Sequence, residues 1–320
     1  MSSTPHSQEA LKAAYGGKNW SPRTASHREE IGSVWGHCGL DSEWKLLKQV
    51  LLHSPGPELA DIADPERVQL LEIPDWHLAR QQHSNLGRAF QRAGVTVHDV
   101  EPNQAPPPNL IFCADLFWMT PEGAILARPA STVRAGEERW VARRLADLGV
   151  PILRTLTGRA TFEGADALWL DPQTVLLGRG LRTNDAGIQQ VSAALNEIGV
   201  QAIPVDLPVG SMHLMGILRI LDGDTALAWP YRLAWHAVEV LKNRGYQVLL
   251  IPNEAEATQG GALNFVTLGP RKILMAAGNP QTQDFLINEG ISCQSVEIGE
   301  LLKAAGGIGC LTGIIERELQ

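Results

Sequence analysis

The sequence is poor in cysteine, in basic charge and in long apolar runs, and each shortage excludes a class of protein. Its four cysteines are scattered over 320 residues without a CxxC pair, which excludes a disulfide framework and is typical of a reduced protein. No run of about 18 apolar residues is available to span a membrane, and residues 1–20 lack the apolar core of a secretory signal. A soluble, cytoplasmic protein is therefore expected.

Basic residues are outnumbered by acidic ones, 27 to 35, and the formal net charge is −8. The chain has no basic stripe of the kind that binding to a phosphate backbone requires, so nucleic acid is not an expected partner. Apolar residues make up 44% of the chain, enough for a sizeable core. The sequence leaves open whether the chain forms a homo-oligomer.

Five segments of the chain share one anatomy: an apolar strand, a turn, an amphipathic helix, a glycine and a second apolar strand. The glycines stand where a left-handed helix cap favours this residue, at nearly regular positions 94, 149, 199, 245 and 290. Any doubly wound α/β protein contains such units. Here, however, a further short apolar strand separates successive units, at 116–120, 166–170, 216–221 and 263–268. A ββαβ unit repeated five times predicts an α/β fold closed into a five-bladed αβ propeller without exposed sheet edges.

The sequence shows no internal domain boundary. Residues 36–320 are expected to form one propeller domain, and the prolines at 106–108 form a rigid connection within it. Residues 1–35 are polar and weakly patterned, and are expected to form an N-terminal arm of uncertain order.

A polar or ionisable residue follows each of the five glycines at a similar distance, within an apolar stretch. These residues are Asp115, Glu163, His213, Asn264 and Cys310. Equivalent positions of a closed radial array converge on its axis, so two acids, a histidine and a cysteine are expected to meet there. A single histidine or cysteine is more often a buried core residue, but the joint placement favours a functional site.

The chemistry of such a meeting is specific. A cysteine beside a protonatable histidine can be held as the nucleophilic thiolate. Two carboxylates suit a planar cation with several N–H donors, namely a guanidinium. Glycines at 306, 307 and 309 allow the backbone to approach a ligand closely. No pair of histidines or cysteines has zinc-ligand spacing, and too little chain follows Cys310 for a phosphate-binding loop. Neither a metal nor an organic cofactor is expected.

Four segments resemble the signature segments of the guanidino-group-modifying superfamily, also called penteins. In order they are FCAD at 112–115, FEGAD at 162–166, MHL at 212–214 and GGIGCLT at 306–312. This superfamily includes arginine deiminases, dimethylarginine dimethylaminohydrolases, agmatine iminohydrolases and amidinotransferases, which share a five-bladed αβ propeller. The resemblance extends over roughly residues 42–320.

The resemblance implies catalytic roles for three residues: Cys310 as nucleophile, His213 as acid–base, and Glu163 as a catalytic carboxylate. Asp115 would hold the guanidinium together with Glu163. Asp166 would share that clamp or support it from behind.

The resemblance also assigns the substrate's head group to two arginines. Arg134 and Arg182 each lie nineteen residues after one of the matched acids, Asp115 and Glu163, and would bind the carboxylate of an arginine-like substrate. The alternative is that both are surface arginines.

Two positions depart from parts of the superfamily. Arginine deiminases and many amidinotransferases have an aspartate two residues after the histidine, where this chain has Met215. On an extended segment Met215 would face the substrate with His213, and it would suit an N-alkyl group better than an N–H. Gly309 stands where agmatine hydrolases and amidinotransferases often have histidine.

The sequence thus predicts a cysteine-dependent hydrolase of a free guanidino compound, arginine or an Nω-substituted arginine, that gives a ureido product such as citrulline. One alternative is an amidinotransferase, in which an amine replaces water. A non-catalytic propeller, similar to the ribosome anti-association factors, is disfavoured because the whole polar set is present.

Overall fold

The computed structural model describes residues 11–319, and its centre is a ring of three-stranded sheets. Each sheet has one antiparallel and one parallel strand pair. In sheet order the strands are β15 (Gly313–Arg317), β1 (Leu47–Leu52) and β2 (Thr96–Asp99); β3 (Phe117–Thr120), β4 (Gly123–Leu126) and β5 (Ile152–Thr155); β6 (Ala167–Asp171), β7 (Thr174–Arg179) and β8 (Gln201–Asp206); β9 (Leu218–Asp222), β10 (Thr225–Ala228) and β11 (Gln247–Leu250); β12 (Val266–Gly269), β13 (Lys272–Ala276) and β14 (Ser292–Val296). The predicted five-bladed αβ propeller is confirmed.

The first sheet closes the ring by joining distant parts of the chain. Its strand β15 pairs antiparallel with β1, with Ile314 opposite Val50 and Gly313 opposite Leu51. The first strand of each of the other four sheets was predicted from the sequence, whereas β15, the first strand of this sheet, was not. Ring closure therefore depends on a strand more than 260 residues away from its partner along the chain.

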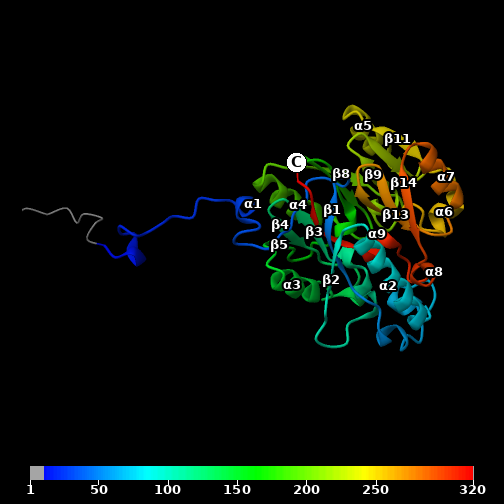
Figure 1. Ribbon diagram of the computed structural model, residues 1–320, viewed down its shortest axis with the longest axis horizontal. Helices are drawn as coiled ribbons and strands as arrows, with labels where there is room; N and C mark the ends of the chain where they lie inside the picture. The colour runs from blue at the N-terminus through cyan, green and yellow to red at the C-terminus, as the bar shows by residue number, and fades with distance from the viewer. Residues whose placement is uncertain (1–10, 320) are drawn as a thin grey trace, which may run out of the picture.

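A helix connects the two parallel strands of every sheet. These helices are α2 (Trp76–Arg92), α3 (Glu138–Asp147), α4 (Asp185–Glu197), α5 (Trp235–Asn243) and α7 (Pro280–Asn288). They lie on the outside of the ring, with the strands inside (Figure 1). Each is followed by one of the five predicted glycines, whose φ angles lie between 75° and 84°, the left-handed conformation that glycine adopts without a steric penalty.

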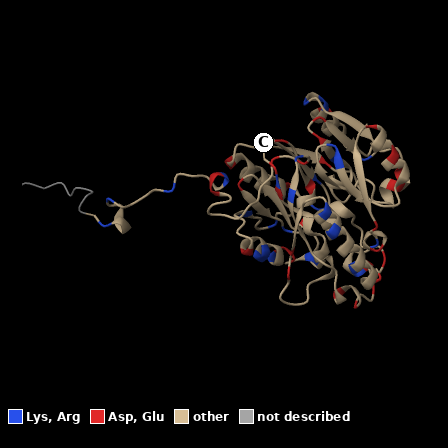
Figure 2. Ribbon diagram, viewed as in Figure 1, with Lys and Arg blue, Asp and Glu red and all other residues tan. Residues whose placement is uncertain are grey.

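Burial follows the layers. The middle strands β4, β7 and β10 are buried over almost their whole length, because one face packs on the outer helices and the other on the centre of the ring. The outer helices carry charged residues toward solvent. Both signs occur on α3 and α5, whereas α2 carries only basic residues and α4 and α7 only acidic ones (Figure 2). On α3, for example, Glu138, Arg139, Arg143 and Asp147 occur within ten residues.

The N-terminal segment differs from the ring. Its described part from residue 11 to about residue 26 runs away from the body (Figure 1) and contains one short 3-10 turn, η2 (Ala13–Tyr15). The segment meets the body at α1 (His27–Glu30), which Ser26 caps in a capping box with Glu29, and the amide of Gly36 then donates to Gly149 O at 2.9 Å. Residues 1–10 of the expected arm lie outside the described residues. The division at residue 36 stays a prediction.

Within residues 11–319 no helix is both long and apolar enough to cross a membrane. The remaining α-helices described there are short: α6 (Glu254–Thr258), α8 (Gly299–Leu302) and α9 (Ile308–Leu311).

Candidate active site

Short turns at the start of the sheets carry the predicted polar residues to the centre of the ring. The 3-10 turns η6 (Cys113–Asp115), η8 (Gly164–Asp166) and η9 (Leu214–Gly216) precede β3, β6 and β9, and α9 precedes β15. Turn η8 contacts both η6 and η9, and η6 contacts α9. The repeat thus delivers one functional side chain per blade to a common place, because each turn occupies the same position in its unit.

Cys310 lies on α9 and is 7% exposed. Burial, together with the negative charge of Asp115, raises the pKa of the Cys310 thiol to about 11. The hydrogen bond from Asn264 opposes this shift, as does the positive charge of Arg219. The cysteine is therefore a thiol in the ligand-free protein at neutral pH, and its ionisation requires a further positive charge nearby.

Asn264 is the polar residue that precedes β12, and its function was not predicted from the sequence. Its Nδ2 donates to Cys310 Sγ at 2.9 Å, and its Oδ1 accepts from the Cys310 amide at 3.0 Å. The two bonds fix the orientation of the Cys310 side chain, and the one to Sγ favours its thiolate form. The signal was present in the repeat, since Asn264 occupies the position equivalent to the four ionisable residues.

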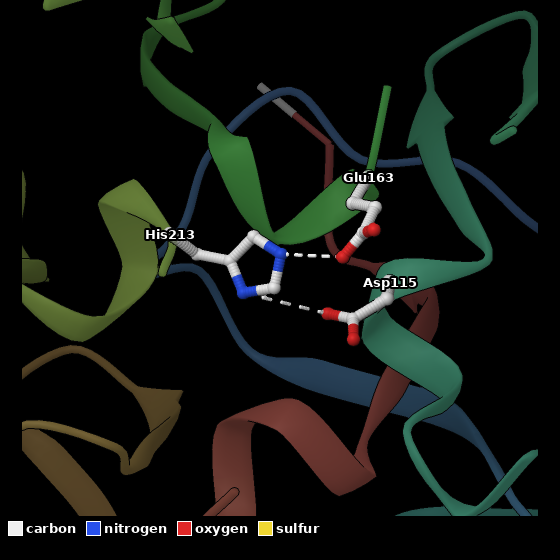
Figure 3. Close-up of side chains that lie close together, drawn as sticks. All are labelled: Asp115, Glu163 and His213. Carbon is white, nitrogen blue, oxygen red and sulfur yellow. Dashed lines mark hydrogen bonds and ion pairs between the residues drawn. The ribbon is translucent and has the colours of Figure 1, made fainter. Parts of the chain in front are cut away.

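His213 is held between two carboxylates (Figure 3). Its Nε2 lies 2.7 Å from Glu163 Oε2, and its Nδ1 lies 3.9 Å from Asp115 Oδ1. Burial disfavours the imidazolium, but Asp115, Asp166 and Glu163 outweigh burial and raise the pKa of His213 to about 9. Glu163 is itself fully buried, which disfavours its charge, yet His213 and the nearby arginines lower its pKa to about 2. At neutral pH the pair is an imidazolium and a carboxylate.

Asp115 has one oxygen, Oδ1, that accepts no hydrogen bond within residues 11–319 and faces His213 Nδ1 at 3.9 Å. Its Oδ2 accepts from Arg134 NH1 at 2.6 Å, whereas Oδ1 is buried and has no hydrogen-bond partner among the described residues. A buried carboxylate oxygen without a donor is costly, about 1–3 kcal/mol or more. Asp115 is therefore prepared to accept an N–H from a cationic ligand.

The two predicted head-group arginines are buried, not surface residues, and they differ in how far they are engaged. Arg134 is 3% exposed and contacts Asp115 and Glu137 at 2.6 and 2.9 Å. Arg182 is 8% exposed, and its nearest carboxylate oxygen, on Glu163, is 3.4 Å away. Arg134 is thus largely committed to acids of the chain itself, and Arg182 is the freer cation.

Asp166 supports the histidine segment from behind. Its Oδ1 accepts from the amide of Leu214 at 2.9 Å, and its Oδ2 accepts from Thr183 Oγ1 at 2.6 Å. Burial raises the pKa of Asp166 to about 6. Both oxygens are thus occupied by the protein, an arrangement that fits the second of the two expected roles, support from behind, and that role stays a prediction.

Met215 does not lie as expected. The segment after His213 is the 3-10 turn η9 and not an extended strand, so a residue two positions on no longer points to the same side. Met215 packs against buried core residues, and its sulfur is close to the backbone of Gly309. It lines neither cavity of the site. Met212, which the sequence did not single out as a site residue, lines both.

Two cavities meet at Cys310. The inner one has a volume of about 20 Å³, room for about one water molecule, so a substrate must widen it. The larger one, the outer cleft, has a volume of about 660 Å³, and both cavities are partly open to solvent. Asp115, Arg134 and Arg182 line the inner cavity, His213 and Asn264 line the outer cleft, and Cys310 lines both.

Asp115, Glu163 and His213 also place three ligand atoms within 4.8 Å of one another, as a metal site would. Positive charge already occupies this cluster, because Arg134 NH1 contacts both acids at 2.6 and 3.6 Å. A metal ion would also have to displace the proton shared by His213 and Glu163. The arrangement suits acid–base chemistry and the binding of an organic cation.

Comparison with known proteins agrees with this geometry. The family profile described as arginine deiminase matches residues 103–234, which contain three of the four signature segments. A dimethylarginine dimethylaminohydrolase from Streptomyces coelicolor is 30% identical over 268 residues, covering 83% of this chain and 96% of its own. The protein of the same name from Pseudomonas aeruginosa is 25% identical and covers 83% and 99%.

Solved structures show the same fold. A variant of the Pseudomonas aeruginosa dimethylarginine dimethylaminohydrolase, complexed with citrulline, superposes with a TM-score of 0.70 at 23% identity, over 85% of this chain and 100% of the other. An amidinotransferase of saxitoxin biosynthesis from Microseira wollei gives a TM-score of 0.73 at 16% identity, over 88% and 97%. The prediction of a hydrolase acting on guanidino C–N bonds is confirmed at the level of the family. With its five-bladed ring and its relative at 30% identity over most of both chains, this chain belongs to the guanidino-group-modifying superfamily of enzymes.

Proposed function

We propose that this protein hydrolyses the guanidino group of arginine or an Nω-methylated arginine to citrulline and the corresponding amine. One observation carries the proposal: Asp115, whose Oδ1 accepts no hydrogen bond from the described part of the chain, and Cys310 line the same cavity, so a guanidinium held by the acid lies next to the nucleophile. The names of the Streptomyces and Pseudomonas relatives support a methylated substrate.

The inner cavity suits an amino-acid head group. Its arginines supply positive charge for an α-carboxylate. Since Arg134 is committed to Asp115 and Glu137, Arg182 is the principal contact for the carboxylate. The guanidinium then reaches Asp115 at the Cys310 end of the same cavity.

The substrate activates the nucleophile. A guanidinium between Asp115 and Cys310 neutralises the acid that raises the thiol pKa and adds a positive charge, so the thiol releases its proton to solvent. The thiolate attacks the guanidinium carbon and forms an S–C bond. The C–N bond to the departing amine then breaks, and the imidazolium of His213 donates the proton that this amine requires.

The second half regenerates the enzyme. Neutral His213 takes a proton from a water molecule that enters by the outer cleft, and the resulting hydroxide attacks the carbon of the covalent amidino-cysteine. The S–C bond breaks and returns thiolate Cys310, imidazolium His213 and the ureido product, whose oxygen releases the second proton of the water to solvent. The thiolate takes up a proton from solvent when the product leaves, which restores the starting thiol. Over the cycle one water is consumed and one amine is released.

Amidino transfer is the alternative, with an amine in place of water in the second half. Both are distinguished by incubating the protein with arginine, Nω-methylarginine and asymmetric dimethylarginine, with and without glycine or lysine as acceptor. Citrulline and free amine in equal amounts support hydrolysis. A new guanidino product that requires the acceptor supports transfer, and neither product from any of these substrates contradicts the proposal.

A further inference from the structure

The outer cleft is much larger than the amine that a methylated arginine would release. Its volume of about 660 Å³ lies in the range of about 300–1,000 Å³ typical of sites for drug-sized ligands. A methyl or dimethyl group would fill only a small part of it. The position and the lining of this cleft indicate what else it accommodates.

The position of the cleft relative to the reaction assigns it to the departing amine. The carboxylate-binding arginines line the inner cavity, whereas His213, which protonates the departing nitrogen in the proposed mechanism, lines the outer cleft. Cys310 stands between them. A substrate with its head group inside therefore directs its Nω-substituent into the outer cleft.

The walls of the cleft combine apolar side chains with polar ones such as Glu72, Gln259 and Lys303. Ile217 and Leu263 are 3% and 1% exposed and form part of the wall. Leu71 and Met212 also line the cleft and are 71% and 37% exposed, so their apolar surface is available to a ligand. Burying a methylene on such a wall is worth about 0.8 kcal/mol, roughly fourfold in affinity.

The wall also holds buried polar atoms without partners. Trp229 and Ser211 are each 8% exposed and line the cleft. Within residues 11–319, Trp229 Nε1 and Ser211 Oγ have no hydrogen-bond partner. The indole is a donor only and requires an acceptor. Arg232 lies over the Trp229 ring at 4.9 Å and adds positive charge beside it.

Together these features define a ligand group. We infer that the outer cleft binds an Nω-substituent with an apolar body and a terminal carbonyl or carboxylate, so that the preferred substrate is an arginine with a departing amine larger than methylamine or dimethylamine. This rests on the proposed function and narrows its substrate class.

The test compares three substrates that share the arginine head: Nω-methyl-, Nω-butyl- and Nω-(3-carboxypropyl)-arginine. Because each buried methylene is worth about fourfold, kcat/KM is expected to rise at least about tenfold from methyl to butyl, and further for the carboxypropyl compound. The released amine is identified in each case.

Gly216 offers a variant that fills the cleft. It lines the cleft, a Cβ added to it meets nothing within 4 Å, and its φ is not in the left-handed range. Gly216→Leu is expected to lower the butyl-to-methyl ratio of kcat/KM about tenfold, and Gly216→Ala is expected to have a smaller effect. Ala60→Leu, at an exposed position away from both cavities, is the matched control and is expected to leave the ratio unchanged.

Trp229→Phe tests the polar end of the cleft. It removes the indole donor while retaining an apolar ring, so only the carboxypropyl-to-butyl ratio is expected to fall, by about fivefold or more. An unaffected carboxypropyl-to-butyl ratio would contradict the part of the inference that gives the substituent a terminal carbonyl or carboxylate.

The possible failures are separable. Turnover of the methyl compound without a gain for the butyl compound overturns the inference and leaves the proposed function standing. Release of ammonia and not butylamine from the butyl compound overturns the assignment of the cleft to the departing amine. No turnover of any of the three compounds contradicts the proposed function itself.

Discussion

Cys310 and His213, the proposed nucleophile and the proposed acid–base residue, occupy equivalent positions of the repeat but have opposite surroundings. Cys310 is paired with a neutral amide, Asn264, which donates to its sulfur, whereas His213 lies between two acids. The pKa of each group is raised, the thiol mainly by burial and the imidazole by negative charge. The repeat therefore determines where the side chains lie, and their immediate neighbours determine which proton each one holds.

The largest expected effect comes from removing the nucleophile itself. Cys310→Ser is expected to lower kcat by at least about 10⁴-fold, because a hydroxyl is a far weaker nucleophile at neutral pH. Cys293→Ser is the control, since Cys293 is half-buried and lines neither cavity. Unchanged turnover in Cys310→Ser would place the chemistry elsewhere.

Removing the acid beside His213 is the next largest change. Glu163→Gln keeps the shape but removes one of the charges that raise the pKa of His213 from 6.5 to about 9. Because the protonated form donates, activity is lost as pH rises through the pKa of His213, and this loss is expected at lower pH in the variant. We expect kcat to fall by about 10²–10⁴-fold. Glu197→Gln is the control and is expected to lose activity at the same alkaline pH as the parent. If Glu163→Gln also loses activity at the parent's pH, the assignment of His213 as the proton donor is contradicted.

Arg182→Ala tests the other end of the inner cavity. Losing a charge-assisted contact is expected to cost about 1.5–3 kcal/mol, or roughly ten- to hundredfold in kcat/KM, for substrates with an α-carboxylate. Agmatine, the analogue without a carboxylate, provides the internal reference. If both substrates lose activity equally, Arg182 acts on the guanidinium end, through Glu163.

Asn264→Ala is expected to have the smallest effect on rate, and it tests the ionisation of the Cys310 thiol most directly. Loss of the donor to Sγ is expected to raise the pKa of Cys310 further and to lower kcat/KM about tenfold. Alkylation of Cys310 by iodoacetamide, measured against pH, reports the shift independently of turnover. Asn243→Ala, at an exposed position on α5, is the control. If the pH profile of alkylation in Asn264→Ala matches those of the parent and of this control, the contact does not affect the pKa of the Cys310 thiol.

The sequence predicted the fold closely because each blade repeats the same apolar pattern and ends its helix with glycine. It also predicted which side chains converge, since equivalent positions of a ring must meet. It could not predict the contacts that depend on local backbone shape. Met215 was expected on an extended segment, but η9 turns it toward the core. The pairing of Asn264 with Cys310 depends on the relative placement of two blades, which no local pattern encodes.

The closure of the ring by β15 has a consequence for biosynthesis. Cys310 lies three residues before β15, and β15 pairs with β1 near the other end of the chain. A ribosome must therefore pass residue 317 before the first sheet is complete, by which point the nucleophile has only just been made. Contacts of such large sequence separation form late and slowly. We therefore expect a chain truncated before β15 to be inactive on guanidines, and activity to begin only when the ring is closed.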